Sequence, residues 1–383
     1  MKFEIYGKEF KEIIDRISGI VPKKTSLNIL ETVKIIAKDQ TLTFQATNTD
    51  DFGIIQTYAF VYEDGAVWVY LSDLKKILGI SDDVIVTAND GKFEVRGHKK
   101  SYEIPCHDNF DEYWFEFPNI KNNDIMCRQH DDEFLTYLSR LNCMRSNNFA
   151  NKMMTAFCID LGRQKIAVLD GYRIGIANLV GGMFAPNCRR LIVNGFLYNG
   201  LKSLIGKIRV RDYIEIYADD KYAKFVGKDW TYITKLVEGT YFDYEKIINS
   251  CKENYDYVYT FNRKELGDIA KEYEKIVNPK NKTPMLIYNN NGNVATGIHV
   301  ENYKTSDILE SAHSEIGMGN EWYVGIDPEY ISDACNMFDA DVKAIGKYSY
   351  KTPIMFMNDT YEALILPINI SDESVMFIKK QVA

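Results

Sequence analysis

The chain of 383 residues predicts an α+β fold in which one domain plan occurs three times. The first observation behind this prediction is a helical pattern of apolar residues that begins at Phe10 and returns at Phe134 and at Leu266. The second is a pair of strand-and-turn segments, one in each of the first two thirds, that align with each other without gaps. At roughly 100–200 residues per domain, the length has room for three domains.

The recurring helix carries apolar residues at i, i+3, i+4 and i+7, which form one face of an α-helix. In the first copy these are Phe10, Ile13, Ile14 and Ile17. The three copies are predicted at 8–19, 131–143 and 262–276. A shorter amphipathic segment follows in each third, near a Ser, Asn or Asp suited to cap a helix, at 71–80, 193–206 and 325–338.

The best internal match joins residues 87–104 to residues 217–234. In it Gly97 aligns with Gly227 and Tyr102 with Tyr232. Both segments alternate apolar and polar residues around turns rich in Asp, Asn and Gly, which predicts antiparallel strands. A more divergent third copy occupies 341–368. We therefore predict domains at 1–122, 123–250 and 251–383, docked rigidly because no Pro/Gly/Ser-rich linker separates them.

Composition limits the possible partners and compartment. The 46 basic and 54 acidic residues give a net charge of −8, so bulk charge alone does not hold this chain on nucleic acid. The seven cysteines are scattered without a CxxC pair, which favours reduced thiols in a cytosolic protein over disulfides or zinc. The charged N-terminus argues against a signal peptide, and no run of 18 apolar residues predicts a membrane span. We expect a cytoplasmic protein that does not bind membranes.

Sequence motifs of catalysis are absent. The chain has no phosphate-binding glycine loop, no HExxH and no GxSxG, and its five histidines lack ligand spacing. Adjacent acidic pairs such as Asp50–Asp51 and Asp131–Asp132 suit caps and turns, because neighbouring residues do not share one face of a helix or strand. We expect no catalytic residues, no metal and no cofactor. An Asp-dependent hydrolase is the weakest hypothesis, and substitutions at Asp50 or Asp131 test it.

Basic residues recur on the polar sides of the predicted helices, for example at Lys11 and Arg16 or at Arg140 and Arg145. One such pair usually marks a solvated helix face. Recurrence in equivalent helices favours another interpretation, since helices of a closed ring point the same way and their charges add into one field.

Several segments together resemble the bacterial sliding clamps, the β subunits of DNA polymerase III. The resemblance runs from Met1 to about Ile370. It is carried by the opening MKF with ISGIVPKKTSLNILETVKI and LTFQATNTD, by VLDGYRIGIAN, by ITKLVEGTYFDYEKII and by the closing LILPI. Each motif is weak alone, but their order on a threefold repeat of this length is specific.

The resemblance implies the DNA-clamp fold in a head-to-tail homodimeric ring, with helices inside and sheets outside. Such a ring encircles duplex DNA without reading its sequence. It tethers partners such as the polymerase III α subunit and the clamp loader through short peptides, and so confers processivity. It has no catalytic chemistry of its own. An acidic chain can hold DNA in this way if its basic residues face the hole.

The resemblance also implies three sets of site residues. The partner-peptide pocket comprises Met154, Leu169, Gly171, Tyr172, Arg173, Ile174, Phe242, Ile247, Leu364 and Leu366. The DNA-facing residues are Lys24, Lys75, Arg140, Arg145, Lys202, Lys264 and Lys271. The dimer interface joins Lys99, Lys100, Tyr102 and Ile104 to Glu272, Glu274, Ile276 and Val277. Phe242 and Leu169 depart from the family pattern, which has Pro and a small residue there, so we expect a bulkier pocket.

Purely structural explanations remain open for the pocket and interface residues. The pocket residues could simply fill a domain junction, and the edge lysines could protect a strand from aggregation. A clamp-like scaffold, plasmid- or phage-borne, could bind partner peptides without encircling DNA. The extension at 371–383 continues past the family's usual end. It could fold over the pocket, form a partner site or be disordered.

Overall fold

The computed structural model describes residues 1–107, 110, 113–120, 124–148, 150–186, 188–207, 210–277, 283–300 and 303–381. The chain forms two compact units. Unit 1 comprises Met1–Thr136 with Gly181–Val237, and unit 2 comprises Tyr137–Val180 with Glu238–Ala383. The limit between the units thus passes through the second predicted domain, and the three domain limits drawn from the sequence stay a prediction.

The first helix of each third forms where the apolar spacing predicts it. The three helices are α1 (Gly7–Ile17), α3 (Asp131–Leu141) and α7 (Arg263–Glu274). In α1 the predicted face is buried, and Phe10 packs among the rings of Phe3, Phe44 and Phe93. The side chain of Asn262 caps α7 by accepting hydrogen bonds from two backbone N–H groups.

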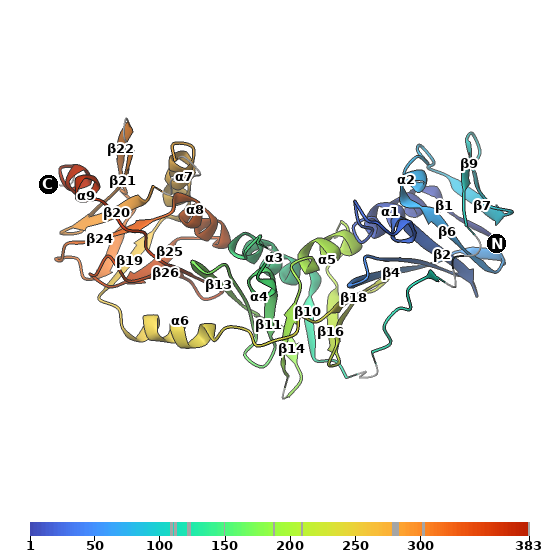
Figure 1. The fold of residues 1–383 in the computed structure, drawn as a ribbon, viewed down its shortest axis with the longest axis horizontal. Helices are drawn as coiled ribbons and strands as arrows, with labels where there is room; N and C mark the ends of the chain where they lie inside the picture. Colours follow the sequence, from blue (N-terminus) through green and yellow to red (C-terminus); the bar gives the residue numbers. More distant parts are fainter. Residues whose placement is uncertain are drawn as a thin grey trace. The chain divides into compact units, whose positions relative to one another are not determined.

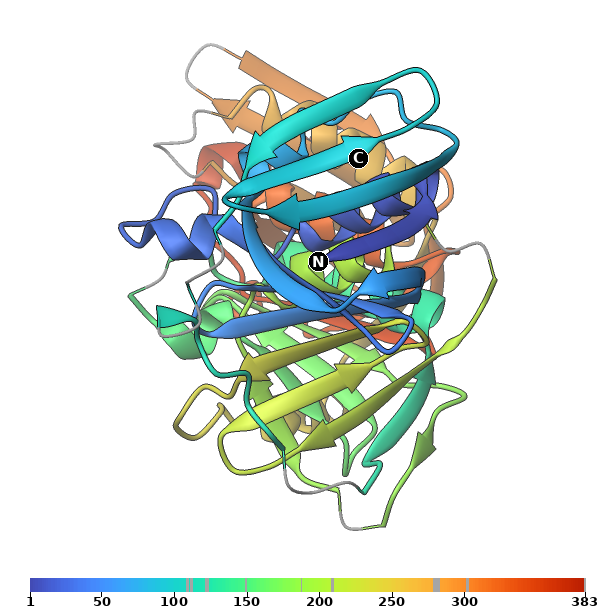
Figure 2. The same cartoon turned by 90° about the vertical axis from the view of Figure 1, so that its right-hand side faces the viewer.

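Unit 1 contains a five-stranded antiparallel sheet in the order β5-β1-β7-β8-β9. Its strands are β1 (Lys2–Tyr6), β5 (Phe60–Glu63), β7 (Asp83–Asn89), β8 (Lys92–Arg96) and β9 (Ser101–Pro105). Figure 2 shows β7, β8 and β9 side by side in light blue to cyan. Strand β9 stands at one end of this sheet.

A nine-stranded sheet completes unit 1, in the order β14-β10-β16-β17-β18-β4-β3-β2-β6. Its strands are β2 (Thr32–Lys38), β3 (Thr41–Thr47), β4 (Asp51–Tyr58), β6 (Gly65–Tyr70), β10 (Cys127–His130), β14 (Met183–Phe184), β16 (Tyr213–Ala218), β17 (Tyr222–Val226) and β18 (Trp230–Lys235). Strands β18 and β4 join the second third of the chain to the first, with Tyr232 opposite Gly53. Helices α1 and α5 (Leu197–Ile205), the latter preceded by β15 (Arg190–Val193), lie over one face (Figure 1).

Unit 2 contains a sheet in which the order is β11-β12-β13-β27-β26-β25-β19-β23. Its strands are β11 (Phe157–Asp160), β12 (Lys165–Leu169), β13 (Arg173–Asn178), β19 (Tyr257–Phe261), β23 (His313–Ile316), β25 (Val342–Gly346), β26 (Ile354–Met357) and β27 (Tyr361–Ile365). A four-stranded sheet has the order β22-β21-β20-β24. Its strands are β20 (Met285–Asn290), β21 (Asn293–Val300), β22 (Tyr303–Ile308) and β24 (Trp322–Ile326).

The strand orders confirm the repeated plan. The order β5-β1-β7-β8-β9 returns as β14-β10-β16-β17-β18 and again as β23-β19-β25-β26-β27. The order β4-β3-β2-β6 returns as β22-β21-β20-β24. Within each unit the last strand of one repeat pairs with an equivalent strand of the preceding repeat, β18 with β4 and β27 with β13.

The second helix of each repeat varies more than the sequence predicts. Helix α8 (Pro328–Met337) lies within the predicted segment 325–338 and is capped by Asp327, but α2 (Leu71–Leu74) ends after one turn. Short elements precede the strands, namely a 3-10 turn at Asn28–Glu31, another at Asn142–Met144 and α4 (Lys152–Thr155). Helix α6 (Tyr244–Glu253) leads into β19.

The C-terminal extension forms α9 (Asp372–Lys379), which packs on β20 and β21 of the four-stranded sheet. Ile378 is buried there against Leu286, Tyr288 and Ala295. The ammonium of Lys379 lies 2.7 Å from a carboxylate oxygen of Glu321. Of the three roles considered for this segment, disorder is excluded for the part up to residue 381 that the structure describes.

Candidate functional site

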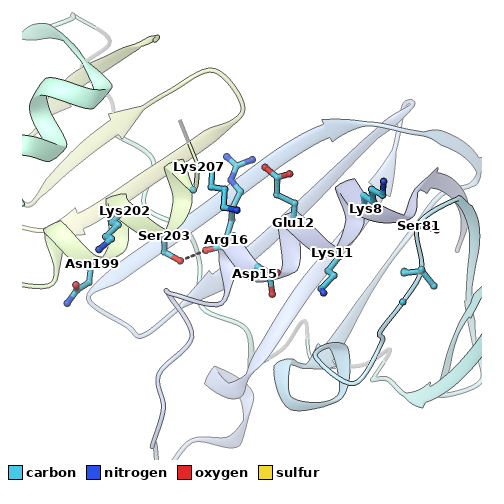
Figure 3. A pocket seen from close by; sticks show the side chains of 13 residues that line it. Lys8, Lys11, Glu12, Asp15, Arg16, Ser81, Asn199, Lys202, Ser203 and Lys207 are labelled. Atoms are coloured by element: carbon cyan, nitrogen blue, oxygen red, sulfur yellow. Dashed lines mark hydrogen bonds between the residues drawn. The ribbon is translucent and has the colours of Figure 1, made fainter. Parts of the chain in front are cut away.

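A broad groove in unit 1 lies between α1, α5 and the loop that follows α2 (Figure 3). Its volume is about 970 Å³. It is lined by Lys8, Lys11, Glu12, Asp15, Arg16, Gly79, Ile80, Ser81, Asn199, Lys202, Ser203, Gly206 and Lys207. Helices from the first and the second third of the sequence therefore share one surface.

The groove is basic although the chain is acidic. The four lysines that line it are exposed, at positions 8, 11, 202 and 207. Two acidic residues, Glu12 and Asp15, also belong to the described lining. A surplus of flexible ammonium groups suits contacts with phosphates, which carry no sequence information.

Helical periodicity explains why two of these lysines lie on the exposed side of α1. Because the apolar face of α1 is buried, Lys8 and Lys11, three residues apart, project from its exposed side. Lys202 was predicted to face DNA and does line the groove, whereas Lys8 was not singled out. The three-residue spacing between Lys8 and Lys11 could have identified Lys8, because it places both lysines on one side of the helix.

Arg16 also lines the groove, but its charge is already matched. Its guanidinium forms two hydrogen bonds with the carboxylate of Asp229, of 2.6 and 2.8 Å. Its Nε donates to the carbonyl of Leu204, near the end of α5, at 2.7 Å. Ser203 in turn donates to the carbonyl of Arg16 at 2.6 Å (Figure 3). Arg16 thus holds α1 and α5 together as the two walls of the groove.

Two arginines predicted to face DNA have partners within unit 2. Arg140 donates to the carbonyl of Met337 at 2.9 Å and to the carboxylate of Asp339 at 2.7 Å. The hydrogen bond with Asp339 raises the pKa of Arg140 and lowers that of Asp339. Arg145 donates to Asn142 at 2.9 Å, and burial lowers its pKa.

The remaining residues predicted to face DNA are exposed lysines on separate segments. They are Lys24 in the loop after α1, Lys75 at the end of α2, and Lys264 and Lys271 on α7. Exposure leaves their ammonium groups accessible to a ligand.

All ten residues predicted for the peptide pocket lie in unit 2. Leu169, Ile174 and Leu364 are neighbours on β12, β13 and β27, where Ile174 pairs with both others. The backbone N–H of Leu366 donates to the carbonyl of Tyr172 at 2.9 Å. The side chain of Met154 lies beside Gly171, whose φ of +95° favours glycine in this turn. Phe242 and Ile247 come from the segment at α6, which the Lys165–Glu245 ion pair ties to β12.

Exposure divides this set in two. Tyr172, Phe242 and Leu366 are 57%, 52% and 39% exposed, so their apolar surfaces are available to a ligand. Leu169, Ile174 and Leu364 are buried and support the surface from within. The bulky Leu169 therefore fills the core, while Phe242 alters the exposed surface.

Arg173 is the one charged residue of the predicted pocket set, and it is buried. Its guanidinium donates to Asp170 at 2.9 Å, to Asp333 at 2.7 Å and to the carbonyl of Cys143 at 2.8 Å, and it stacks 4.2 Å from the ring centre of Tyr330. Burial lowers the pKa of Arg173, but the two carboxylates outweigh burial and leave it raised. Arg173 therefore remains charged and orders the turn that carries Tyr172.

The residues predicted for the dimer interface lie in both units, and each half is described separately. In unit 1, Lys99 and Lys100 occupy the turn before β9, and Lys100 and Tyr102 both donate to the carbonyl of Leu78. In unit 2, Glu272 and Glu274 lie in the last turn of α7, followed by Ile276 and Val277. Lys99 and Glu272 are exposed.

Among the residues that the structure describes, no group of three or more His, Cys, Asp or Glu side chains is arranged to hold a metal ion. All seven cysteines are free thiols. No helix in the described ranges has the length and apolar character needed to cross a bilayer.

Comparison with known proteins gives structural matches only. Neither family models nor curated protein sequences match the chain. Among solved structures, a putative DNA polymerase III beta subunit from Eubacterium rectale superimposes with a TM-score of 0.84 at 20% identity, over 97% of this chain and 99% of that one. The DNA polymerase sliding clamp of Bacillus subtilis matches with a TM-score of 0.84 at 15% identity, over 97% and 100% of the two chains.

A third structure, the Helicobacter pylori beta clamp bound to a DNA ligase peptide, matches with a TM-score of 0.78 at 15% identity, over 96% and 100% of the two chains. These likenesses span the length of both partners, and the repeated strand order agrees with them. This chain has the α+β fold of the bacterial sliding clamps, the β subunits of DNA polymerase III.

Proposed function

We propose that this chain is a DNA sliding clamp, of which two copies close head to tail into a ring around duplex DNA. The observation that carries the proposal is the clamp fold over 97% of the chain. In this ring the helices of the three domains line the hole and the sheets form the outside. The clamp acts in the cytoplasm, needs no cofactor and catalyses no reaction.

The physical benefit of a ring is topological. A closed ring leaves DNA only by opening or by sliding off an end, so retention does not require tight contacts. Weak phosphate contacts from the basic groove then allow sliding, and they are sensitive to salt. A polymerase bound to the ring meets DNA at a high effective concentration, which increases processivity.

Partner binding is the second part of the proposal. The exposed apolar side chains of Tyr172, Phe242 and Leu366 form a surface for short peptides, supported by the buried members of the predicted pocket. A few apolar anchors supply most of the affinity in such contacts. The partners are the polymerase III α subunit and the clamp loader. The Helicobacter pylori clamp, which binds a DNA ligase peptide, provides a precedent.

Retention on circular DNA tests the ring. The protein is incubated with a nicked circular plasmid and the complex is separated from free protein by gel filtration. We expect protein to co-elute with the circle and to dissociate when the plasmid is cut once. Equal binding to circular and linear plasmid contradicts the proposal and favours the scaffold that does not encircle DNA.

A further inference from the structure

The junction between the first two repeats contains an arginine that spans it. Arg16, in the last turn of α1, binds the carbonyl of Leu204 near the end of α5 and the carboxylate of Asp229. Asp229 lies in the turn between β17 and β18, which the Gly227 N–H closes on the Trp230 carbonyl. The guanidinium therefore ties a first helix to the second helix and the last hairpin of the next repeat.

The second junction repeats this arrangement within unit 2. Arg140 follows Arg16 at the same interval at which Phe134 follows Phe10, so both arginines occupy the tenth position of an eleven-residue helix. Arg140 binds the carbonyl of Met337, the last residue of α8, and the carboxylate of Asp339. The helix position and the type of carbonyl partner recur, while the acid comes from the loop after α8.

The third repeat reverses this charge. The tenth position of α7 is Glu272, which follows Arg140 at the same interval at which Leu266 follows Phe134. The counterpart of Asp229 in the first repeat is Lys99, in the turn that the Gly97 N–H closes on the Lys100 carbonyl. Arginine facing aspartate has thus become glutamate facing lysine. Within the described part of the chain, neither Glu272 nor Lys99 has a salt bridge.

The sheet edges also indicate an incomplete third junction. Equivalent strands pair at both internal junctions, β18 with β4 and β27 with β13. Strand β9 of the first repeat is equivalent to β18 and β27, and strand β22 of the third repeat is equivalent to β4 and β13. Both β9 and β22 stand at the end of their sheets. One chain therefore presents one half of a third junction at each of these two edges.

We propose that Glu272 of one copy forms an ion pair with Lys99 of a second copy, and that this reversed pair is the charge contact of the third junction. The inference rests on the proposed head-to-tail ring and names the contact that selects the partner edge. Reversal adds specificity, because Lys99 attracts a glutamate at the tenth position of the facing helix and repels an arginine there, the residue that α1 and α3 carry. Helix α7 is therefore directed to the first repeat of another copy.

Charge reversal with complementation tests the pair. Sedimentation across a concentration series distinguishes one chain of 44.2 kDa from a dimer of twice that mass. We expect Glu272→Lys and Lys99→Glu each to raise the dimer dissociation constant about tenfold or more, because like charges then face each other at both junctions. Mixing the two single variants should restore dimers. One junction of the mixed dimer then joins unchanged Glu272 to unchanged Lys99, and the other joins the two substituted residues, whose charges are opposite. The double variant should also dimerise.

Different outcomes contradict the Glu272–Lys99 ion pair and the proposed ring. A wild-type chain that stays monomeric at all concentrations contradicts the ring itself. A wild-type dimer that is unchanged by either reversal, or single variants that mixing does not rescue, overturns the ion pair and leaves the ring standing. Glu373→Lys, an exposed reversal on α9, is the matched control and should dimerise like the wild type. Circular dichroism of each variant checks that it is folded.

Discussion

Asp51 shows how a single residue stabilises the joint between two repeats. It lies on β4, is almost fully buried, and accepts hydrogen bonds from Tyr232 at 2.5 Å and from Asn194 at 3.1 Å. Burial, together with the charge of Asp51, raises the pKa of Tyr232 well above its usual value. The sequence placed Asp51 in a turn, but the fold uses it as the acceptor of a buried polar network.

Removing the Tyr232 hydroxyl should destabilise unit 1. We expect Tyr232→Phe to lower the free energy of unfolding by about 1–3 kcal/mol, because the buried carboxylate of Asp51 loses a donor. Urea denaturation measures the change. Tyr222→Phe, on the adjacent strand, should change stability by less than about 0.5 kcal/mol. Equal effects of the two variants would contradict the role of the network.

The thiols give a second prediction at this scale. Burial raises the pKa of Cys127, Cys143 and Cys335 to about 12. Such thiols are almost entirely protonated at pH 8, so alkylation should be very slow in the native protein. Mass spectrometry after iodoacetamide should find these three sites unmodified in the folded chain and all seven modified in denaturant. Rapid native labelling of the three would contradict their raised pKa values.

At the scale of elements, two glycines leave space for the C-terminal segment that contains α9 to pack on the four-stranded sheet. A Cβ atom on Gly297 of β21 would lie 1.9 Å from Cδ1 of Ile378, and one on Gly325 of β24 would lie 2.3 Å from Cγ1 of Ile370. The missing side chains leave space for the two isoleucines of the C-terminal segment. Helix α9 is therefore an integral part of the third repeat.

This packing predicts a sharp contrast along one helix. We expect Ile378→Ala to lower the free energy of unfolding by about 2–4 kcal/mol, because it leaves a cavity in the core. Met376→Ala, at a position that is 64% exposed, should change stability by less than about 0.5 kcal/mol. Thermal and urea denaturation followed by circular dichroism compare the two. Similar small effects would show that α9 is dispensable.

Elements also show the limits of sequence-based prediction. The helices α1, α3 and α7 are predicted well, since four apolar residues at helical spacing are a local signal. The segment 71–80 carries the same kind of pattern, yet α2 ends at Leu74 and the next residues form turns before β7. The pattern marks which side chains are buried, but not how many turns of helix the neighbouring sheet accommodates.

At the scale of the whole molecule, the groove lysines link charge to retention on DNA. We expect Lys8→Glu combined with Lys202→Glu to shorten residence on nicked circular plasmid. The slope of log binding constant against log salt should also fall by about 1 for each phosphate that the variant no longer binds. Gel filtration at several salt concentrations measures both quantities.

The control for this prediction is Lys347→Glu, an exposed reversal outside the groove. It should leave retention and its salt dependence unchanged. If the groove variant and the control behave alike, the groove does not bind DNA. The dimer mass of the groove variant must equal that of the wild type, so that weaker retention reports on DNA binding.

By itself the sequence determined the α+β class, the threefold repeat, the first helix of each repeat and the lack of known catalytic motifs. The helices and the motifs depend on spacing within short segments, and the repeat is recognised by comparing such segments with one another. The sequence also indicated candidate residues for three sites, and one of these residues, Lys202, lines the groove. Only the tertiary structure decided that Arg16 and Arg140 already have acidic partners and that Tyr172, Phe242 and Leu366 are exposed while Leu364 is not. The Arg16 partners are 188 and 213 residues away, and at such separations only the docking of whole elements determines which charges meet.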